Sequence, residues 1–128
     1  MQEWTTTACP DQVSRLRHAV AGFAADQGLP TRRVDDVAIA VSELVSNAVV
    51  HAYRHSDKVG TVKVLARRSD RDIVIRIVDD GLGLRPRDDS PGAGLGLQIA
   101  GLVADDLEIS ERYPSGTEVR LTFAAAAA

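Results

Sequence analysis

Glu43-Leu44-Val45-Ser46-Asn47 is the segment that most constrains the fold of this chain, together with Asp79-Asp80-Gly81-Leu82-Gly83 further along. On a helix, the carboxylate of Glu43 and the amide of Asn47 lie on one face, one turn from each other. Two further strings complete the pattern: Gly92-Ala93-Gly94-Leu95-Gly96-Leu97 and Gly116-Thr117. One such glycine string is common by chance in loops. The four strings in this order predict a nucleotide pocket.

The segment around Glu43 has the periodicity of a long helix that begins near Thr31, a residue suited to the N-cap. Apolar residues at spacings of three and four predict one buried arc: Val34, Val37, Ala38, Val41, Leu44, Val45, Ala48 and Ala52. Polar residues stand on the other side: Asp36, Glu43, Asn47, His51 and Arg54. The sequence therefore predicts a core helix whose polar side carries the candidate site.

The other segments alternate between strand and helix patterns. Strands are predicted at 3–8, 61–66, 73–78, 107–112 and 118–123, and further helices at 10–27 and from about 95 to 103, with a polar loop at 54–58. This order predicts an α+β fold, a two-layer α/β sandwich with helices packed on one face of a mixed, mostly antiparallel sheet. No linker or repeat interrupts it. Residues 1–128 are therefore expected to form one domain, with 124–128 as a flexible alanine tail.

Bulk properties exclude several classes of protein. The 128 residues are 45% apolar, enough for the core of one domain but too few for a complete histidine kinase. The formal net charge of −3 offers no basic surplus, so neither nucleic acid nor a membrane is expected as a partner. Cys9 is the single cysteine, and no Cys/His cluster accompanies His51, so neither an internal disulfide nor a zinc site is expected. No segment looks like a signal peptide or a spanning helix, and the cytoplasm is the expected compartment.

The four strings resemble the ATPase family shared by gyrase, Hsp90, histidine kinases and the MutL repair proteins, over residues from about 32 to 123. The resemblance implies ATP and magnesium as cofactors. It implies that Asn47 holds magnesium, that Glu43 acts as the base and that Asp79 accepts a hydrogen bond from the adenine amino group. The glycine-rich turn would lie along the phosphates. The ATP-binding set expected from the resemblance is Asn47, His51, Asp79, Gly81, Gly83, Gly92, Gly94, Leu95, Gly96, Leu97 and Thr117.

The chemistry of the side chains agrees with these roles. Magnesium takes only one or two protein oxygens besides phosphates, so the amide oxygen of Asn47 is enough. Glu43 could take a proton from an attacking hydroxyl. Asp79 ends an apolar strand, where a charge is costly unless it has a partner; its neighbour Asp80 is the competing candidate. Taken singly, each of these residues is more often an ordinary surface or turn residue, and only their combination favours a site.

Within that family, the compact size and the string Ser42–Tyr53 (SELVSNAVVHAY) most resemble the anti-sigma-factor serine kinases of bacteria. That resemblance implies a sigma factor and an anti-anti-sigma antagonist, phosphorylated on serine, as partners. It also implies a homodimer formed through the first strand and helix. Arg15 and Arg17 are candidate contacts, with a solvated helix flank as the alternative. Two other functions stay open: an ATP-binding regulatory module without kinase activity, and a detached histidine-kinase-like catalytic domain.

One segment departs from the expected pattern. Ser90-Pro91-Gly92-Ala93 lacks the basic residue that some kinases of this type carry directly before the glycine-rich turn. Arg85 and Arg87, in a polar loop expected to act as a lid, are candidates to replace it. If neither does, the domain would bind ATP and transfer phosphate inefficiently. The sequence does not name the sigma factor, the antagonist or the triggering stress.

Overall fold

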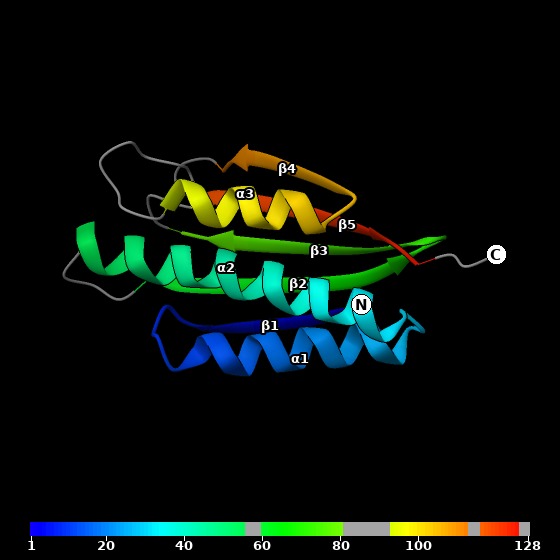
Figure 1. Ribbon diagram of the computed structural model, residues 1–128. Helices are drawn as coiled ribbons and strands as arrows, with labels where there is room; N and C mark the ends of the chain where they lie inside the picture. Colours follow the sequence, from blue (N-terminus) through cyan, green and yellow to red (C-terminus); the bar gives the residue numbers. More distant parts are fainter. Residues whose placement is uncertain (56–59, 81–92, 113–115, 126–128) are drawn as a thin grey trace.

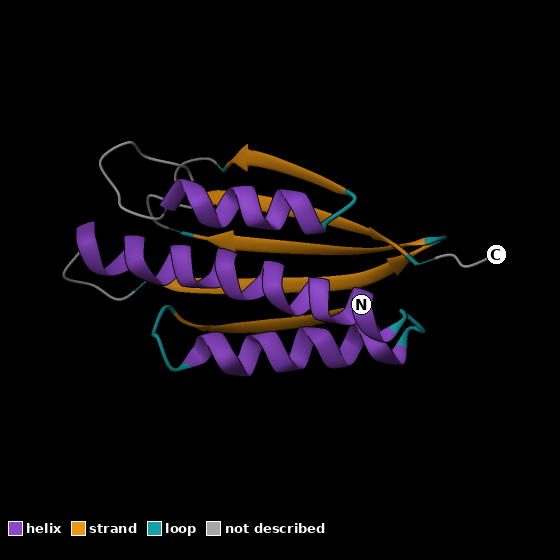
Figure 2. Cartoon of the chain, in the orientation of Figure 1, coloured by secondary structure: helices purple, strands orange, loops and turns teal. Residues whose placement is uncertain are grey.

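Three helices pack on one face of a five-stranded sheet (Figures 1 and 2). The computed structural model describes residues 1–55, 60–80, 93–112 and 116–125. The elements in chain order are β1 (Gln2–Thr7), α1 (Gln12–Asp26), α2 (Thr31–His55), β2 (Thr61–Ser69), β3 (Asp72–Asp79), α3 (Ala93–Val103), β4 (Asp106–Glu111) and β5 (Thr117–Ala124). The predicted α+β sandwich is confirmed, with each strand and helix within a few residues of its expected place.

The sheet has the strand order β1-β2-β3-β5-β4, and all four pairings are antiparallel. The expectation of a mostly antiparallel sheet is therefore met, without a parallel pair among the described strands. β3 is followed by α3, which lies over the sheet before the chain returns through β4 and β5 (Figure 1). β3 thus lies at the centre of the sheet, with β2 on one side and β5 on the other.

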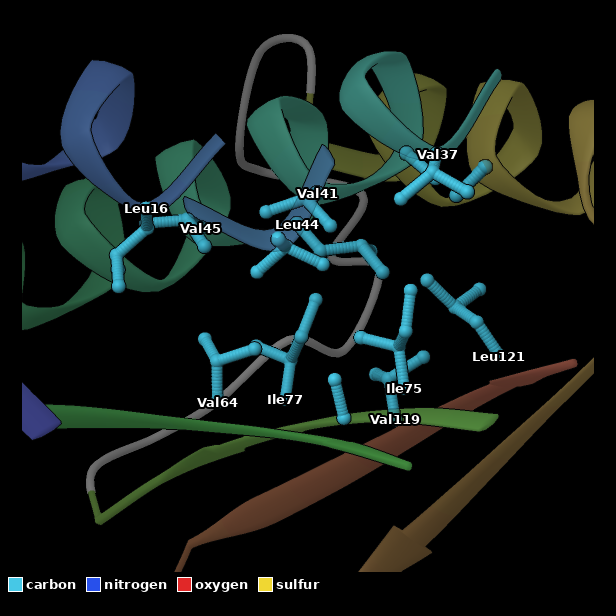
Figure 3. Packing of buried hydrophobic residues seen from close by; sticks show 14 of the residues in the cluster. Leu16, Val37, Val41, Leu44, Val45, Val64, Ile75, Ile77, Val119 and Leu121 are labelled. Atoms are coloured by element: carbon cyan, nitrogen blue, oxygen red, sulfur yellow. The ribbon is translucent and has the colours of Figure 1, made fainter. Parts of the chain in front are cut away.

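The core lies between the sheet and the helices. Alternate residues of the three central strands point to the helix side and are buried: Val62, Val64, Ala66, Ile73, Ile75, Ile77, Val119, Leu121 and Phe123. Figure 3 shows side chains of α2, among them Val37, Val41 and Leu44, pointing toward this strand surface. The apolar face of the strands, which repeats every two residues, packs against the apolar face of α2, which follows the helical period. Both faces are thereby removed from water.

Three details of α2 differ from the prediction. The carbonyl of Pro30 accepts bonds from the backbone N–H groups of Arg33 (2.8 Å) and Val34 (2.9 Å), so Pro30 and not Thr31 is the N-cap. The helix also continues through His55, beyond the predicted end. In addition, Ala40 is fully buried whereas Ala38 is only half-buried. The buried arc is wider than predicted because α3 packs against a second side of α2.

Arg33 fastens the far end of α3 to the start of α2. Its guanidinium donates to the carbonyl of Val103, the last residue of α3, at 3.0 Å and to Asp105 at 2.7 Å. It also lies over the ring of Phe123, with 5.4 Å to the ring centroid. A cation at the C-terminus of a helix is favourable, so this contact helps to hold α3 in place. None of the three helices, over the residues described, combines the length and apolar character needed to cross a membrane.

Candidate nucleotide site

α2 carries the first part of the site. Asn47 is 9% exposed and Glu43, one turn earlier, is partly exposed. The sequence assigned both residues to the polar side of the helix. Asn47 is nevertheless buried because α3 covers that side. A buried amide on a core helix needs hydrogen-bonding or metal partners.

α3 approaches Asn47 through Gly96. A Cβ atom at Gly96 would lie 2.7 Å from Nδ2 of Asn47 and 3.2 Å from its Oδ1, closer than side chains tolerate. Any larger residue at this position would force the Asn47 side chain or the helix to shift, so glycine permits this close contact between the two helices. The sequence suggests that these glycines precede the helix. The helix begins at Ala93, however, so Gly94 and Gly96 lie in its first turns. The contact with α2 stabilises a helical start that glycines alone disfavour.

β3 and β5 supply a polar pair at the end of the core. Asp79 and Thr117 are opposite each other in the register, and they are only 5% and 2% exposed. Residues directly opposite in adjacent strands point to the same face, and for this pair it is the face that carries Ile77 and Val119. The apolar row of the core thus ends in a carboxylate and a hydroxyl beneath the helices. A carboxylate buried there has a high desolvation cost, which partners must offset.

Gly116 allows the two strands to end in this way. Its φ is +106°, and a Cβ there would lie 2.3 Å from the carbonyl oxygen of Asp79. Both the backbone angle and the space exclude other residues at this position without a shift of the backbone. No sequence pattern marks the approach of Gly116 to Asp79, because it depends on how β3 and β5 pair.

Asp80, the competing candidate for the adenine contact, points away from the helices. Its carboxylate accepts a bond from the backbone N–H of Thr61 at 3.1 Å and another from the Thr61 hydroxyl at 2.9 Å. It is exposed, as expected from the alternation after buried Asp79. Of the two acids, only Asp79 faces the layer between sheet and helices. Asp80 therefore holds the chain and does not line the same space.

Several predicted site residues fall outside the described residues: Gly81, Gly83, Arg85, Arg87 and Gly92. For His51, Gly94 and Leu95 only the helical backbone is described.

Leu97 is buried in the hydrophobic core. Its side chain therefore packs with core residues. The resemblance includes Leu97 in the expected ATP-binding set as part of the glycine-rich string. Among the two predicted partner contacts, Arg15 is exposed, and Arg17 donates to the Ser14 hydroxyl at 3.1 Å.

An ion network lies on the outer face of the sheet, away from these residues. Arg76 of β3 donates two bonds to the carboxylate of Glu118, at 3.0 and 2.8 Å, and Arg112 donates a third at 3.2 Å. The hydrogen bond from Arg76 holds the pKa of Glu118 below its ordinary value, and the same bond raises the pKa of Arg76. Burial opposes both shifts. This network stabilises the outer face of the sheet, and Asp79 lies on the opposite, helix-facing side.

The donor atoms of α2 fit magnesium better than a transition metal. Asn47 and Glu43 offer only oxygen as metal ligands, and magnesium prefers one or two such ligands together with phosphate oxygens. Within the described ranges no group of three or more His, Cys, Asp or Glu side chains is placed to hold a metal ion. An Asn47 amide next to the start of α3 suits a metal that is held mainly by bound phosphates.

The elements around the site thus define a class: a nucleotide-binding domain with a buried strand-end acid, a core-helix amide and a glycine-rich helix start on an antiparallel sheet. The chain belongs to the family of histidine kinase-like ATPase domains, which matches residues 6–123.

Two curated relatives are similar over most of their length. The chain is 32% identical over 120 residues to the anti-sigma F factor of Caldanaerobacter subterraneus subsp. tengcongensis, covering 85% of this chain and 82% of that protein. It is 30% identical over 117 residues to the anti-sigma F factor of Clostridium acetobutylicum, covering 83% and 80%.

Solved structures share the fold at lower identity. The RsbU and RsbW domains of Rv1364c from Mycobacterium tuberculosis match with a TM-score of 0.73 and 22% identity, over 97% of this chain and 32% of that one. The SiaB-SiaC complex from Pseudomonas aeruginosa matches with a TM-score of 0.70 and 14% identity, over 96% of this chain and 90% of that one. The described sheet and helix layer is therefore an arrangement that these structures share.

Proposed function

We propose that this protein is an anti-sigma factor that binds ATP with magnesium and phosphorylates a serine of an anti-anti-sigma antagonist. Two observations support the proposal: Gly96 of α3 lies against the Asn47 side chain of α2, and buried Asp79 lies opposite buried Thr117 at the ends of β3 and β5. The curated relatives named as anti-sigma F factors support the anti-sigma part of this proposal. A sigma factor and its antagonist act where transcription takes place, so the proposed compartment is the cytoplasm.

Asp79 and Thr117 would hold the adenine. The amino group of adenine is a hydrogen-bond donor, and the Asp79 carboxylate is an acceptor at the buried end of β3. The hydroxyl of Thr117 lies opposite it in the register and adds a second polar contact. A base bound here would place a hydrogen-bond donor against a buried carboxylate. This accounts for a polar pair at the end of an otherwise apolar row.

Asn47 and the start of α3 would hold the phosphate end. The N-terminus of a helix offers free N–H groups and a favourable dipole to anions. Gly96 brings this helix end against the Asn47 side chain, whose amide oxygen would hold magnesium beside the phosphates. When bound, the metal would neutralise charge on the transferred phosphoryl group. The role of this chain is to orient the phosphates between two helices.

Glu43 would act as the base. It lies one turn from Asn47 on α2 and is partly exposed, so it can reach both the phosphate end and an incoming protein. Its carboxylate would accept the proton of the acceptor serine as the oxygen attacks the γ-phosphorus and ADP leaves. A binding-only regulator would not need an acid at this position.

The edge formed by β1 and α1 would serve partner binding. A cleft of about 360 Å³ lies between them, and its lining includes Trp4, Gln12, Arg15 and Leu16. Oε1 of Gln12 is buried there and accepts no hydrogen bond within the described part of the chain. β1 is an edge strand, so its outer side offers backbone groups for pairing. A homodimer, with the sigma factor contacting the same end, would cover these groups.

Transfer of the labelled γ-phosphate from ATP tests the proposal. The protein is incubated with magnesium and candidate anti-anti-sigma proteins, each also as a variant with the candidate serine replaced by alanine. Label on the wild-type antagonist and none on the serine-free variant is the expected result. ATP binding without transfer to any candidate would support the binding-only regulator. Acid-labile label on a histidine-bearing protein would support the detached histidine-kinase-like domain.

A further inference from the structure

Asp80 and Thr61 contact each other just beyond the last paired residues of the sheet, and the proposed function gives this contact no role. Val62, Asp79 and Thr117 form the last paired row across β2, β3 and β5. Extending the register by one residue brings Thr61 and Gly116 opposite Asp80. Asp80 therefore lies between these two residues, directly after Asp79.

Asp80 closes this row on the β2 side with its own side chain. Its carboxylate accepts from the Thr61 N–H at 3.1 Å and from the Thr61 hydroxyl at 2.9 Å. Bonds to an ionised acceptor are stronger than neutral ones, and two bonds to one residue also fix a direction. The position of the Asp80 side chain is therefore tied to β2 and not to solvent alone.

Thr61 is itself a firm anchor. It pairs with Thr7 of β1 in the register, and the carbonyl of the preceding residue, Gly60, accepts a bond from the Ala8 N–H at 2.8 Å. The start of β2 is thus held by β1 on its other side. A group bonded to Thr61 is bonded to a fixed part of the sheet.

Gly116 closes the row on the β5 side. Its backbone lies so close to the Asp79 carbonyl that a Cβ would come within 2.3 Å of that oxygen and within 3.2 Å of the Asp80 Cα. The peptide between Asp79 and Asp80 is therefore held from both flanks. Since the Asp79 side chain is buried and projects from this peptide, its direction follows from the same constraint.

We propose that Asp80 and Thr61 are positioning residues that hold the Asp79 carboxylate in the direction needed to accept the adenine amino hydrogen bond. Asp80 does not touch the nucleotide in this account. The proposal rests on the proposed function, because it deepens how the same site selects its base. It also explains why two acids stand in succession: one faces the base, and the other holds the strand end.

Base selectivity tests the pair. ATP is compared with purine riboside triphosphate, which lacks the 6-amino group, by calorimetric titration of the wild type, Thr61→Val, Thr61→Ser, Asp80→Ala, Asp80→Asn and the double variant Thr61→Val with Asp80→Ala. Thr122→Val, on the far half of β5, controls for loss of a threonine hydroxyl from the sheet. Asp79→Asn serves as the reference for loss of the base contact.

Thr61→Val and Asp80→Ala are expected to weaken ATP binding by about three- to tenfold, the scale of one misaligned hydrogen bond. Binding of the analogue should change little, because it makes no amino contact to lose. Thr61→Ser and Asp80→Asn, which can keep hydrogen bonds to the partner, should stay near the wild type, and the double variant should be no weaker than Asp80→Ala.

Four results would overturn the proposal. Wild-type affinity in Thr61→Val together with a loss in Asp80→Ala would mean that Asp80 contacts the nucleotide directly. Equal losses for ATP and the analogue would mean that the pair only supports the fold. A wild-type protein that does not prefer ATP to the analogue would contradict the proposed base contact and this inference with it. A wild-type protein that does not bind ATP would contradict both of these and would also reject the proposed function.

Discussion

Asn47 is subject to two constraints at once, one from the fold and one from the proposed chemistry. Its side chain is buried under α3, where Gly96 leaves just enough room for it. An alanine would fill that room poorly, and a larger residue would push the two helices apart. The amide is the member of the site whose loss should separate metal binding from folding most clearly.

Replacing Asn47 with alanine is expected to weaken ATP binding in magnesium by about tenfold or more, the scale of a lost charge-assisted contact. In EDTA the same variant should bind ATP almost as the wild type does, because the metal contact is absent from both. Calorimetric titration under the two conditions measures the difference. Asn47→Asp, which keeps an oxygen ligand, should retain more of the magnesium effect. Equal losses with and without magnesium would point to a folding defect.

Residue patterns predicted the strands and the apolar side of α2, because alternation and helical spacing are local properties of the chain. The burial of Asn47 and the exact start of α3 could not be predicted in this way. Both depend on α3 packing against α2, a contact between segments far apart in the sequence. The prediction of Thr31 as the N-cap of α2 was wrong for a smaller reason. The carbonyl of Pro30 accepts the first helical hydrogen bonds as well as a threonine carbonyl does.

At the scale of elements, the contact of α3 with α2 decides the geometry of the site. Arg33 holds the C-terminal end of α3, and Gly96 sets the approach near its other end. The two contacts together fix how the first turns of α3 face Asn47. A change that moves one helix by a few tenths of an ångström should therefore affect binding before it affects stability.

Gly96→Ala should lower ATP affinity by about tenfold or more while leaving stability nearly unchanged. The added methyl would lie 2.7 Å from Nδ2 of Asn47, an overpacking that costs about 1–3 kcal/mol. The gain in helix propensity, about 1 kcal/mol, offsets much of this. Gly101→Ala is the matched control, since a Cβ there meets nothing within 4 Å. That control should melt slightly higher and bind ATP normally, and a Gly96→Ala variant that also binds normally would contradict the close approach.

The outer face of the sheet gives a pH-dependent prediction. Because Arg76 lowers the pKa of Glu118, the folded state favours the ionised carboxylate. The stabilisation is full above the ordinary glutamate pKa of about 4.3 and is lost as pH falls through the lower folded value. Glu118→Gln should therefore be less stable than the wild type near neutral pH, by up to about 1 kcal/mol since the pair is partly exposed. Denaturant titrations at falling pH should show the two proteins converging, and a constant gap down to pH 3 would contradict the ion pair's role.

For the whole molecule, the two proposed sites lie on different elements. The proposed nucleotide site is carried by α2, α3, β3 and β5, and the cleft between β1 and α1 lies at the edge strand. The fold could be predicted from the sequence because its strand and helix patterns are local, and four short strings supply the residues of the proposed site. The cleft was not, because no local pattern marks the space between a strand and a helix. Partner binding at that edge can leave the nucleotide site accessible to a second protein.

Glu43 is where the account separates an enzyme from a binding module on one fold. Its carboxylate is partly exposed one turn from Asn47, so an acceptor hydroxyl and the phosphate would meet beside it. Asp35→Asn, at an exposed acid two turns earlier on α2, is the matched control for loss of a carboxylate from that helix.

The most direct test is single-turnover transfer of labelled phosphate to an antagonist protein by the wild type, Glu43→Gln and Asp35→Asn, with ATP affinity measured in parallel. The account predicts that Glu43→Gln binds ATP as tightly as the wild type but transfers phosphate at least about a hundredfold more slowly, the usual scale for a general base. Asp35→Asn should match the wild type in both measurements. Phosphoryl transfer by Glu43→Gln at the wild-type rate would contradict the account.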